Sequence, residues 1–358
     1  MNEMIEEPEK GSIENYLTEM PKAELHIHLE GSLSPETIVS ITQRNQLDYF
    51  RTIEEVQESL ANRPPGLMGF LEHHFKSQEV MQTPQDFYDA TTNLIKTLND
   101  NKVVYVDLFF DPQVHTSRGI QFGAFFEAID AARRDARKQH QTEVQLIMCA
   151  NRERSVEGAF EMLDQAQPYK DKILGFGLDS GPEYGNPPIK FKDVFAHARG
   201  EGYFITAHHD VDVRDSVKHM WQSMNVIQID RIDHGLNSLE DPALIQAFIE
   251  QEMCLTGSPV KRSTDPDLQD VARITALDKA GVSVSVHSDD PEEFDSGYLT
   301  NMLILFQRSS GYSKADMTRL MLNAFKGIWI EPQRTNYISQ LKRYAEASGV
   351  SWSAVLRQ

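Results

Sequence analysis

The sequence has little cysteine and no long apolar run. Its 358 residues include two cysteines, Cys149 and Cys254, and neither lies in a CxxC or Cys/His pattern with zinc-finger spacing. A disulfide framework is therefore excluded, and a reducing cytoplasm is the simplest setting. The opening residues are acidic and lack the apolar segment of a secretory signal. No stretch approaches the length of a membrane span.

Positive charge is also scarce. The chain carries 35 Lys and Arg against 54 Asp and Glu, a formal net charge of −19. Such a surface repels phosphate backbones and anionic lipids, so we expect no nucleic acid and no membrane as partners. A small-molecule substrate fits this charge better. The sequence leaves the oligomeric state open, and a homo-oligomer is compatible with it.

Linkers rich in glycine and serine, low-complexity tracts and strong internal repeats are absent as well. Short apolar runs instead alternate with longer amphipathic segments, which predicts one α/β domain over residues 1–358, a (β/α)8 TIM barrel. No glycine-rich dinucleotide turn follows the first run, which argues against an open doubly wound sheet. The predicted strands are 23–28, 103–110, 143–150, 173–178, 203–208, 229–233, 252–256 and 282–287.

Helices are predicted between these strands. Ser34-Pro35-Glu36 has the N-cap residue, the N1 proline and the first-turn acid that are typical of a helix start. We expect residues 34–101 to form a helical insertion over the barrel mouth and residues 312–358 to form helices outside the barrel. The individual helices are predicted at 67–82, 85–101, 121–139, 155–167, 190–200, 241–251 and 267–280.

Polar residues gather where the predicted strands end, at Asp111, Asp179, His208, His234 and Asp289. In a parallel barrel the carboxyl ends of all strands meet at one mouth, where active sites form. The first strand ends in His26 and His28, which are two residues apart and so point to the same face. An HxH pair alone is commonly two solvated histidines. The further His and Asp strand ends favour a metal site instead.

Several segments carry a resemblance to a known family. The segment PKAELHIHLEGS (21–32) resembles the opening of the adenosine/adenine deaminase family of the amidohydrolase superfamily. The segments RIDHG (231–235) and SDDP (288–291) are similar to two further motifs of that family. The segments FFDPQVH (109–115) and GLDS (177–180) most resemble the bacterial adenine deaminase subgroup. The resemblance runs from about residue 15 to about residue 340.

The resemblance implies a zinc-dependent hydrolytic deaminase that acts at C6 of adenine or of a modified purine, N6-substituted purines included. His26, His28, His208 and Asp289 would bind one Zn²⁺, although Fe²⁺ or Mn²⁺ could occupy the same ligands. The metal would lower the pKa of a bound water toward neutrality and so make a hydroxide nucleophile.

The resemblance also assigns roles around that metal. His234 would orient the attacking water and stabilise charge, and Asp289 would take a proton from the water while ligating the metal. Asp290 would hydrogen-bond a ring nitrogen, although an aspartate before Pro291 is also a common turn former. The Gly181 backbone would contact another ring nitrogen, and Glu30 would line the substrate pocket.

One departure from the family affects the reaction. The fifth-strand histidine of the family is followed by Ala, Gly and a Glu that protonates the purine ring, whereas here Val211 stands at the position of that acid. Valine cannot donate a proton, and general acid catalysis contributes roughly 10²–10⁴-fold. Asp212, Asp210 or His209 could supply the proton, and we take Asp212 as the candidate.

Two other functions stay open because of Val211. The chain could be a metal hydrolase repurposed for a non-purine substrate, in which a ring-protonating acid is not needed. It could also be a non-catalytic binding protein that keeps a zinc barrel. Arg262 would add positive charge at the mouth and could bind an anionic group, or it could be a surface arginine.

Two placements of side chains are predicted as well. Phe109 and Phe110 should split, with one ring inside the barrel and the other outside, because adjacent strand residues point to opposite faces. His73 and His74 lie in the middle of a predicted helix, where solvated or packing roles are expected rather than metal ligation.

Overall fold

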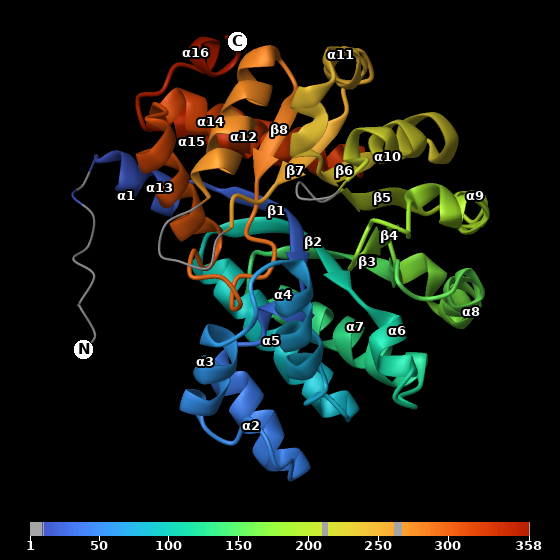
Figure 1. Ribbon diagram of the computed structural model, residues 1–358. Coiled ribbons are helices and arrows are strands. Elements are labelled where there is room, and N and C mark those ends of the chain that lie inside the picture. The colour runs from blue at the N-terminus through green and yellow to red at the C-terminus, as the bar shows by residue number, and fades with distance from the viewer. Residues whose placement is uncertain (1–8, 10, 210–213, 261–266, 358) are drawn as a thin grey trace.

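The structure is a computed structural model that describes residues 9, 11–209, 214–260 and 267–357. Val211, Asp212 and Arg262 therefore lie outside the described residues. Eight strands lie in one sheet in the order of the sequence, and adjacent strands are parallel (Figure 1). Each predicted strand is present, with ends within two residues of the prediction. The strands are β1 (Lys22–His28), β2 (Val103–Phe110), β3 (Glu143–Asn151), β4 (Gly175–Asp179), β5 (Phe204–His209), β6 (Arg231–His234), β7 (Cys254–Gly257) and β8 (Ser283–Val286).

The ring of strands closes between β1 and the segment after β8. Ile27 and Asp289 form a parallel bridge. The His28 amide donates to the Asp289 carbonyl over 3.1 Å, and the Asp289 amide donates to the His26 carbonyl over 3.0 Å. Closure pairs both sheet edges, as a barrel requires. The predicted (β/α)8 barrel is confirmed.

The strands are apolar on both faces because both faces are covered. Every residue of β1, β2 and β4 is buried, which is typical of parallel strands with helices outside and packed side chains inside. Phe109 points into the barrel, where it packs against Ile147 and Cys149. Phe110 points outward and contacts Phe126 with 6.1 Å between ring centroids. The predicted split of this pair is therefore confirmed.

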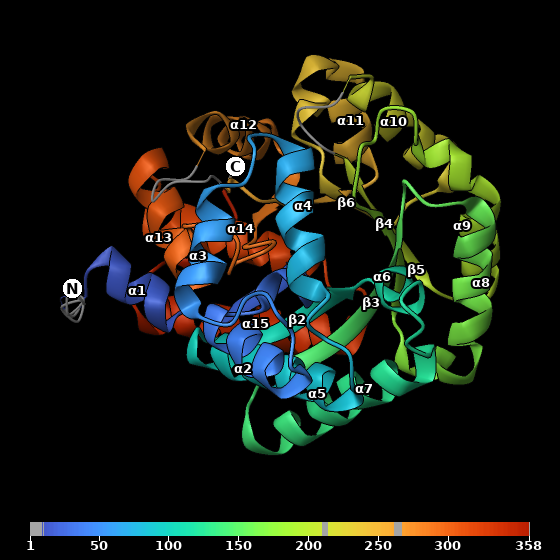
Figure 2. The ribbon, with the colours of Figure 1, turned by 60° about the horizontal axis from the view of Figure 1, so that its bottom comes forward.

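The helices surround the strands, and in Figure 2 helices α7 to α11 form an arc outside them. Ser34 caps α2 as expected, because its hydroxyl accepts the Thr37 amide over 3.2 Å. The helices of eight or more residues are α2 (Pro35–Asn45), α3 (Ile53–Ala61), α4 (Leu67–Gln78), α5 (Pro84–Asp100), α7 (Phe122–Gln139), α8 (Val156–Ala166), α9 (Lys192–Gly200), α11 (Pro242–Glu250), α12 (Leu268–Ala280), α13 (Leu299–Ser310), α14 (Lys314–Lys326) and α15 (Glu331–Ala347). The shorter ones are α1 (Ile13–Glu19), α6 (Pro112–Thr116), α10 (Ser216–Gln222) and α16 (Trp352–Val355).

The four helices α2 to α5 lie between β1 and β2, in the segment 34–101 that was expected to cover the barrel mouth. They occupy different places in the fold. α5 packs against β2 and α7, so it occupies the place of a barrel crossover helix. α4 packs against the 3-10 turn Glu30–Ser32 that follows β1, which places this helix at the mouth of the barrel. Among helices that the structure describes, none combines the length and apolar character that crossing a membrane requires.

Candidate active site

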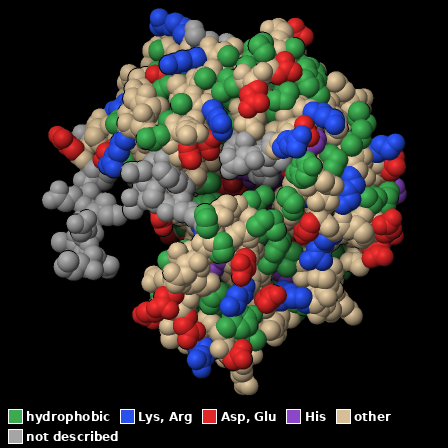
Figure 3. Space-filling view, in the orientation of Figure 1, with side chains coloured by type: hydrophobic (Ala, Val, Ile, Leu, Met, Phe, Trp, Pro, Cys, Tyr) green, Lys and Arg blue, Asp and Glu red, His purple; other side chains and the backbone are tan. Residues whose placement is uncertain are grey.

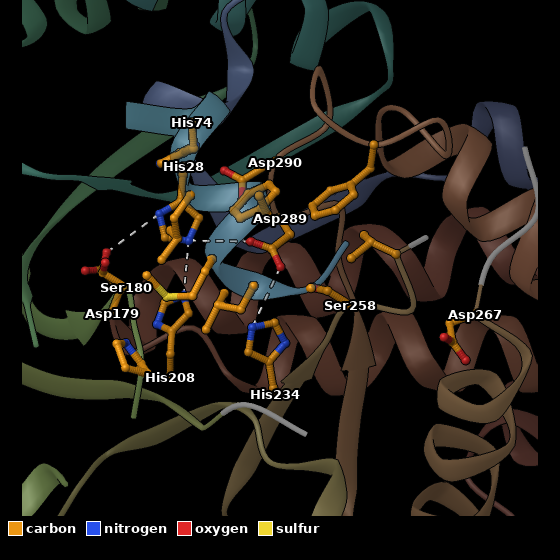
Figure 4. A pocket seen from close by; sticks show the side chains of 18 of the residues that line it. His28, His74, Asp179, Ser180, His208, His234, Ser258, Asp267, Asp289 and Asp290 are labelled. Atoms are coloured by element: carbon orange, nitrogen blue, oxygen red, sulfur yellow. Dashed lines mark hydrogen bonds and ion pairs between the residues drawn. The ribbon is translucent and has the colours of Figure 1, made fainter. Parts of the chain in front are cut away.

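Four buried polar side chains meet at the mouth of the barrel. They are His26 and His28 on β1, His208 on β5, and Asp289 after β8, and one ligand atom from each lies within 4.8 Å of the others. The Nε2 atoms of His28 and His208 are 3.1 Å apart. Asp289 Oδ1 lies 3.3 Å from His26 Nε2 and 3.5 Å from His28 Nε2. Figure 4 shows His28, His208 and Asp289 pointing toward one another.

Thr256 on β7 determines which nitrogen His26 offers to this cluster. The Thr256 hydroxyl donates to Asp233 Oδ1 over 2.9 Å, and its oxygen lies 3.1 Å from His26 Nδ1. Because the only hydroxyl hydrogen is used on Asp233, His26 Nδ1 must donate to Thr256, and Nε2 faces the cluster. Thr206 adds a second hydroxyl to Asp233 over 2.5 Å.

The charges of the four side chains suit a divalent ion. Burial holds the pKa of both His28 and His208 well below the ordinary histidine value, so these imidazoles are neutral with a lone pair available. Burial alone would raise the pKa of Asp289, but His26, together with His234 and His28, outweighs burial and holds this pKa far below the usual range. Three imidazole nitrogens and one carboxylate oxygen are ligands that fit zinc and similar ions.

His234 stands beside the cluster at the end of β6. Its Nε2 lies 3.7 Å from Asp289 Oδ2, and burial lowers its pKa to about 4, so the ring is neutral at physiological pH. His234 and Asp289 both have φ of 62°, and Ser180 after β4 has φ of 60°. Left-handed backbone at non-glycine residues is uncommon and is concentrated at functional sites.

A cavity of about 1010 Å³ opens over the cluster, at the upper end of the range for small-molecule sites. His28, His208, His234, Asp289 and Asp290 form part of its wall. Figure 3 shows apolar side chains around a hollow on this face. Much of the apolar wall comes from α4, namely Leu67, Met68, Phe70, Leu71 and Phe75.

Asp290 contributes a buried carboxyl group to this wall. The residue is 5% exposed, and burial together with the charge of Asp289 raises its pKa well above the ordinary range. A protonated carboxyl can donate a hydrogen bond, which an ionised one cannot.

Glu30, expected in the substrate pocket, is 1% exposed and is not among the residues that line the cavity. Its Oε1 accepts the Asp111 amide over 3.1 Å and lies 3.0 Å from His115 Nε2. Arg118 donates to His115 Nδ1 over 2.8 Å, so the Nε2 hydrogen of His115 points to Glu30. Glu30 thus contacts Asp111, which lines the cavity, but does not line the cavity itself.

Asp111 and Asp179 form an acidic pair in the cavity wall. Asn151 Nδ2 donates to Asp111 Oδ2 over 2.8 Å and to Asp179 Oδ1 over 3.2 Å. Burial and the charge of Glu30 raise the pKa of Asp111 to about 7, and burial and Asp111 raise that of Asp179 well above its ordinary value. Asp179 Oδ2 is 3.9 Å from His28 Nδ1. The sequence placed both aspartates among the polar strand ends at the barrel mouth but gave neither a role in binding the metal or the substrate.

Gly181 lies between two cavity residues, Ser180 and Pro182, in the loop after β4. A Cβ at this position would stand 2.5 Å from Leu67 Cδ2 on α4. A larger residue at position 181 would therefore push the Leu67 side chain of α4 away from the loop after β4.

His209, one of the three candidates for the missing proton donor, points away from the cavity. Its Nδ1 lies 3.2 Å from Glu183 Oε1, and its Nε2 lies 3.1 Å from Ser223 Oγ. His219 on α10 also reaches Glu183 Oε1, over 2.8 Å. Both ring nitrogens of His209 are thus engaged, whereas Asp210 and Asp212 lie outside the described residues.

His74 is a titratable residue of the cavity wall to which the sequence analysis gave no role in the site. It lies on α4 and lines the cavity, although we expected a packing or solvated histidine. Leu67, Phe70, Leu71 and His74 are spaced i, i+3, i+4 and i+7, which marks one helix face. Together with the predicted position of this segment over the mouth, that spacing could have identified His74.

Known proteins share this sequence and this architecture. The family profile described as Adenosine deaminase matches residues 21–343. An adenine deaminase of Acinetobacter baylyi is 36% identical over 328 residues, which cover 90% of this chain and 97% of the relative. An uncharacterised deaminase of Schizosaccharomyces pombe is 37% identical over 337 residues, 94% of this chain and 98% of that protein.

Two solved structures have the same fold. The crystal structure of an adenine deaminase from Arthrobacter aurescens matches with a TM-score of 0.81 and 28% identity, covering 91% of this chain and 99% of that one. A zinc-bound amidohydrolase from Burkholderia ambifaria matches with a TM-score of 0.83 and 22% identity over 94% of each chain. With a family profile that spans most of its length and curated relatives above 30% identity, this chain belongs to the adenosine deaminase family.

Proposed function

We propose that this chain is a metal-dependent hydrolase that removes the C6 amino group of adenine or of a modified purine, N6-substituted purines included. The observation that carries this proposal is the convergence of His26, His28, His208 and Asp289 within 4.8 Å at the base of one cavity. The adenine deaminases among its relatives support the choice of a purine.

We assign the metal to these four residues and zinc as the preferred ion. The donor set of three imidazoles and one carboxylate supports zinc, and so does the bound zinc of the Burkholderia ambifaria amidohydrolase. When bound, the ion would polarise the substrate and lower the pKa of a water molecule.

The residues around the metal would bind and orient the substrate. His234 is a neutral imidazole 3.7 Å from Asp289, a position that suits orienting a water molecule and stabilising charge, and the ionised Asp289 can accept a proton. Asp290, as a protonated carboxyl, suits donation to a ring nitrogen. The Gly181 backbone would meet a second ring nitrogen. Glu30 would limit the pocket from behind Asp111.

The proton donor is assigned to Asp212, on the sequence alone. Val211 cannot perform this role, and the ring of His209 is held by Glu183 and Ser223. Asp212→Asn should therefore lower kcat on adenine by roughly 10²–10⁴-fold. Asp210→Asn serves as the matched comparison, because the two aspartates flank Val211.

The proposed function is tested by release of ammonia, or of the amine, from a panel of purines. The panel contains adenine, adenosine, AMP and N6-substituted adenines, each with the zinc-reconstituted protein. His28→Ala should lose both the metal and turnover, whereas His197→Ala, a side chain that is 47% exposed on α9, should lose neither. Metal-dependent turnover of one member would establish a C6 hydrolase. If the protein holds one metal ion per chain but releases no ammonia or amine from any purine of the panel, the purine proposal is contradicted. A hydrolase for another substrate or a binding protein would then be favoured.

A further inference from the structure

His74 is held in one orientation at the cavity wall. Its Nδ1 lies 3.0 Å from Glu293 Oε1, and its ring stacks on Phe70 with 5.4 Å between centroids. The side chain is 7% exposed, and the residue lines the cavity. Figure 4 shows His74 on the same side of the cavity as Asp290.

Glu293, the partner of His74, is itself anchored. Arg63 donates to the Glu293 carbonyl over 2.7 Å, and its guanidinium lies 5.2 Å from the Phe70 ring centroid and 5.6 Å from that of Phe294. The two phenylalanine rings stack with 5.2 Å between centroids. This cluster joins α4 to the segment after β8, so the imidazole cannot turn without breaking several contacts.

The anchoring leaves one nitrogen of His74 for a ligand. Glu293 takes Nδ1, and Nε2 makes no hydrogen bond to any residue that the structure describes. Burial lowers the pKa of His74, but Glu293 outweighs burial and raises it to about 10. Both ring nitrogens then carry hydrogen at physiological pH, and Nε2 is a charged donor.

A fixed donor at this place suits a purine. Asp289, which lines the cavity and is held ionised, can only accept hydrogen bonds. Three of the four ring nitrogens of a neutral free purine are acceptors as well. Val211 removes one donor that relatives have, so a second donor near Asp290 would complete the recognition of the ring.

We propose that His74 is a substrate-binding residue whose Nε2–H donates to a purine ring nitrogen on the Asp290 side of the cavity. The inference rests on the proposed function, since it names a contact to the same substrate. A hydrogen bond to a charged group contributes about 1.5–3 kcal/mol. Loss of this contact should therefore weaken purine binding by roughly 10- to 100-fold.

The test measures binding of unsubstituted purine to the zinc-loaded protein by titration calorimetry. His74→Phe keeps a ring that stacks on Phe70 but removes the donor, and His74→Gln restores a neutral donor. The control is His73→Phe, because His73 is equally buried on the same helix, bonds Ser59 over 2.9 Å and does not line the cavity. Thermal unfolding and zinc content report whether each variant is folded and loaded.

We expect weaker binding for His74→Phe, partial recovery for His74→Gln and no change for His73→Phe. With 3-deazapurine or 7-deazapurine, the analogue that lacks the acceptor of His74 should bind wild type and His74→Phe equally. Equal binding of purine by folded wild type and His74→Phe would overturn the inference while leaving the proposed function intact. No purine binding by the wild type would overturn both.

Discussion

Gly31 and Asp290 occupy the same small space at the mouth of the barrel. A Cβ at Gly31 would stand 1.7 Å from Asp290 Oδ1 and 2.3 Å from its Cγ, distances that no pair of non-bonded atoms tolerates. Gly31 follows the metal-ligand strand β1, and Asp290 follows the candidate ligand Asp289. The absence of a side chain at residue 31 therefore determines where the Asp290 carboxyl can lie.

Gly31→Ala should displace Asp290 and lower kcat/KM on the preferred purine by up to about tenfold, the scale of one lost hydrogen bond between neutral groups. Zinc content should stay near that of wild type, because the three atoms nearest this Cβ belong to Asp290 and not to the four candidate ligands. Gly200→Ala is the control, since nothing lies within 4 Å of a Cβ there. Steady-state kinetics would measure kcat/KM of both variants against wild type. An unchanged kcat/KM for Gly31→Ala would show that Asp290 is not needed in its present position.

Asp233 lies behind two of the candidate metal ligands and orients them, so its loss should weaken metal binding. Its carboxylate accepts from Thr256, which fixes His26, and Oδ2 lies 3.6 Å from His208 Nδ1. Asp233→Asn should lower zinc affinity by roughly 10- to 100-fold, as is usual for residues that orient ligands. Competition with a fluorescent chelator measures this affinity. Asp135→Asn, at an exposed position on α7, should bind zinc as wild type does.

Arg231 and Asp107 form a fully buried ion pair, 2.6 Å apart, inside the barrel. Asp107→Asn leaves the buried Arg231 guanidinium with only the more distant carboxylate of Asp233, 3.6 Å from its Nε, so this change should lower the free energy of unfolding by up to about 3–5 kcal/mol. Chemical denaturation gives this value. The exposed pair Glu14–Arg308, at 2.7 Å, provides the comparison, because Arg308→Ala should cost less than about 1 kcal/mol. If both variants lost a similar amount of unfolding free energy, the expected effect of burial on the ion pair would be contradicted.

The pair of His74 and Glu293 should make stability depend on pH. The pKa of His74 is about 10 in the folded chain and about 6.5 when unfolded. A raised pKa stabilises the fold fully below the unfolded value, and this contribution disappears as pH rises through the folded value. The difference in unfolding free energy between wild type and His74→Phe should therefore shrink between about pH 6.5 and about pH 10. A constant difference over that window would mean that His74 is neutral in the folded protein.

Local patterns in the sequence predicted the barrel and the metal ligands. Period-two spacing places His26 and His28 on one face of β1, and the rule that parallel strands end at one mouth brings His208 and Asp289 to them. The convergence of these residues needs only the strand periodicity and the strand order, whereas the choice of His208 and Asp289 among the polar strand ends is what the family resemblance implies. The ends of β4, β6 and β7 differ by two residues from the prediction because short strands end where pairing ends, not where the apolar run does.

The tertiary structure decided the contacts between segments whose relative position no local pattern specifies. His74 faces the cavity because α4 docks on the segment after β8 through Glu293. Glu30 stands behind Asp111 because His115, 85 residues further along the chain, takes its carboxylate. The amino-acid sequence thus determined the barrel and the strand ends that carry the candidate metal ligands, since periodicity and capping act over a few neighbouring residues. The charge and orientation of the residues that surround the substrate depend on burial and on partners from distant segments, which exist only after the barrel has closed.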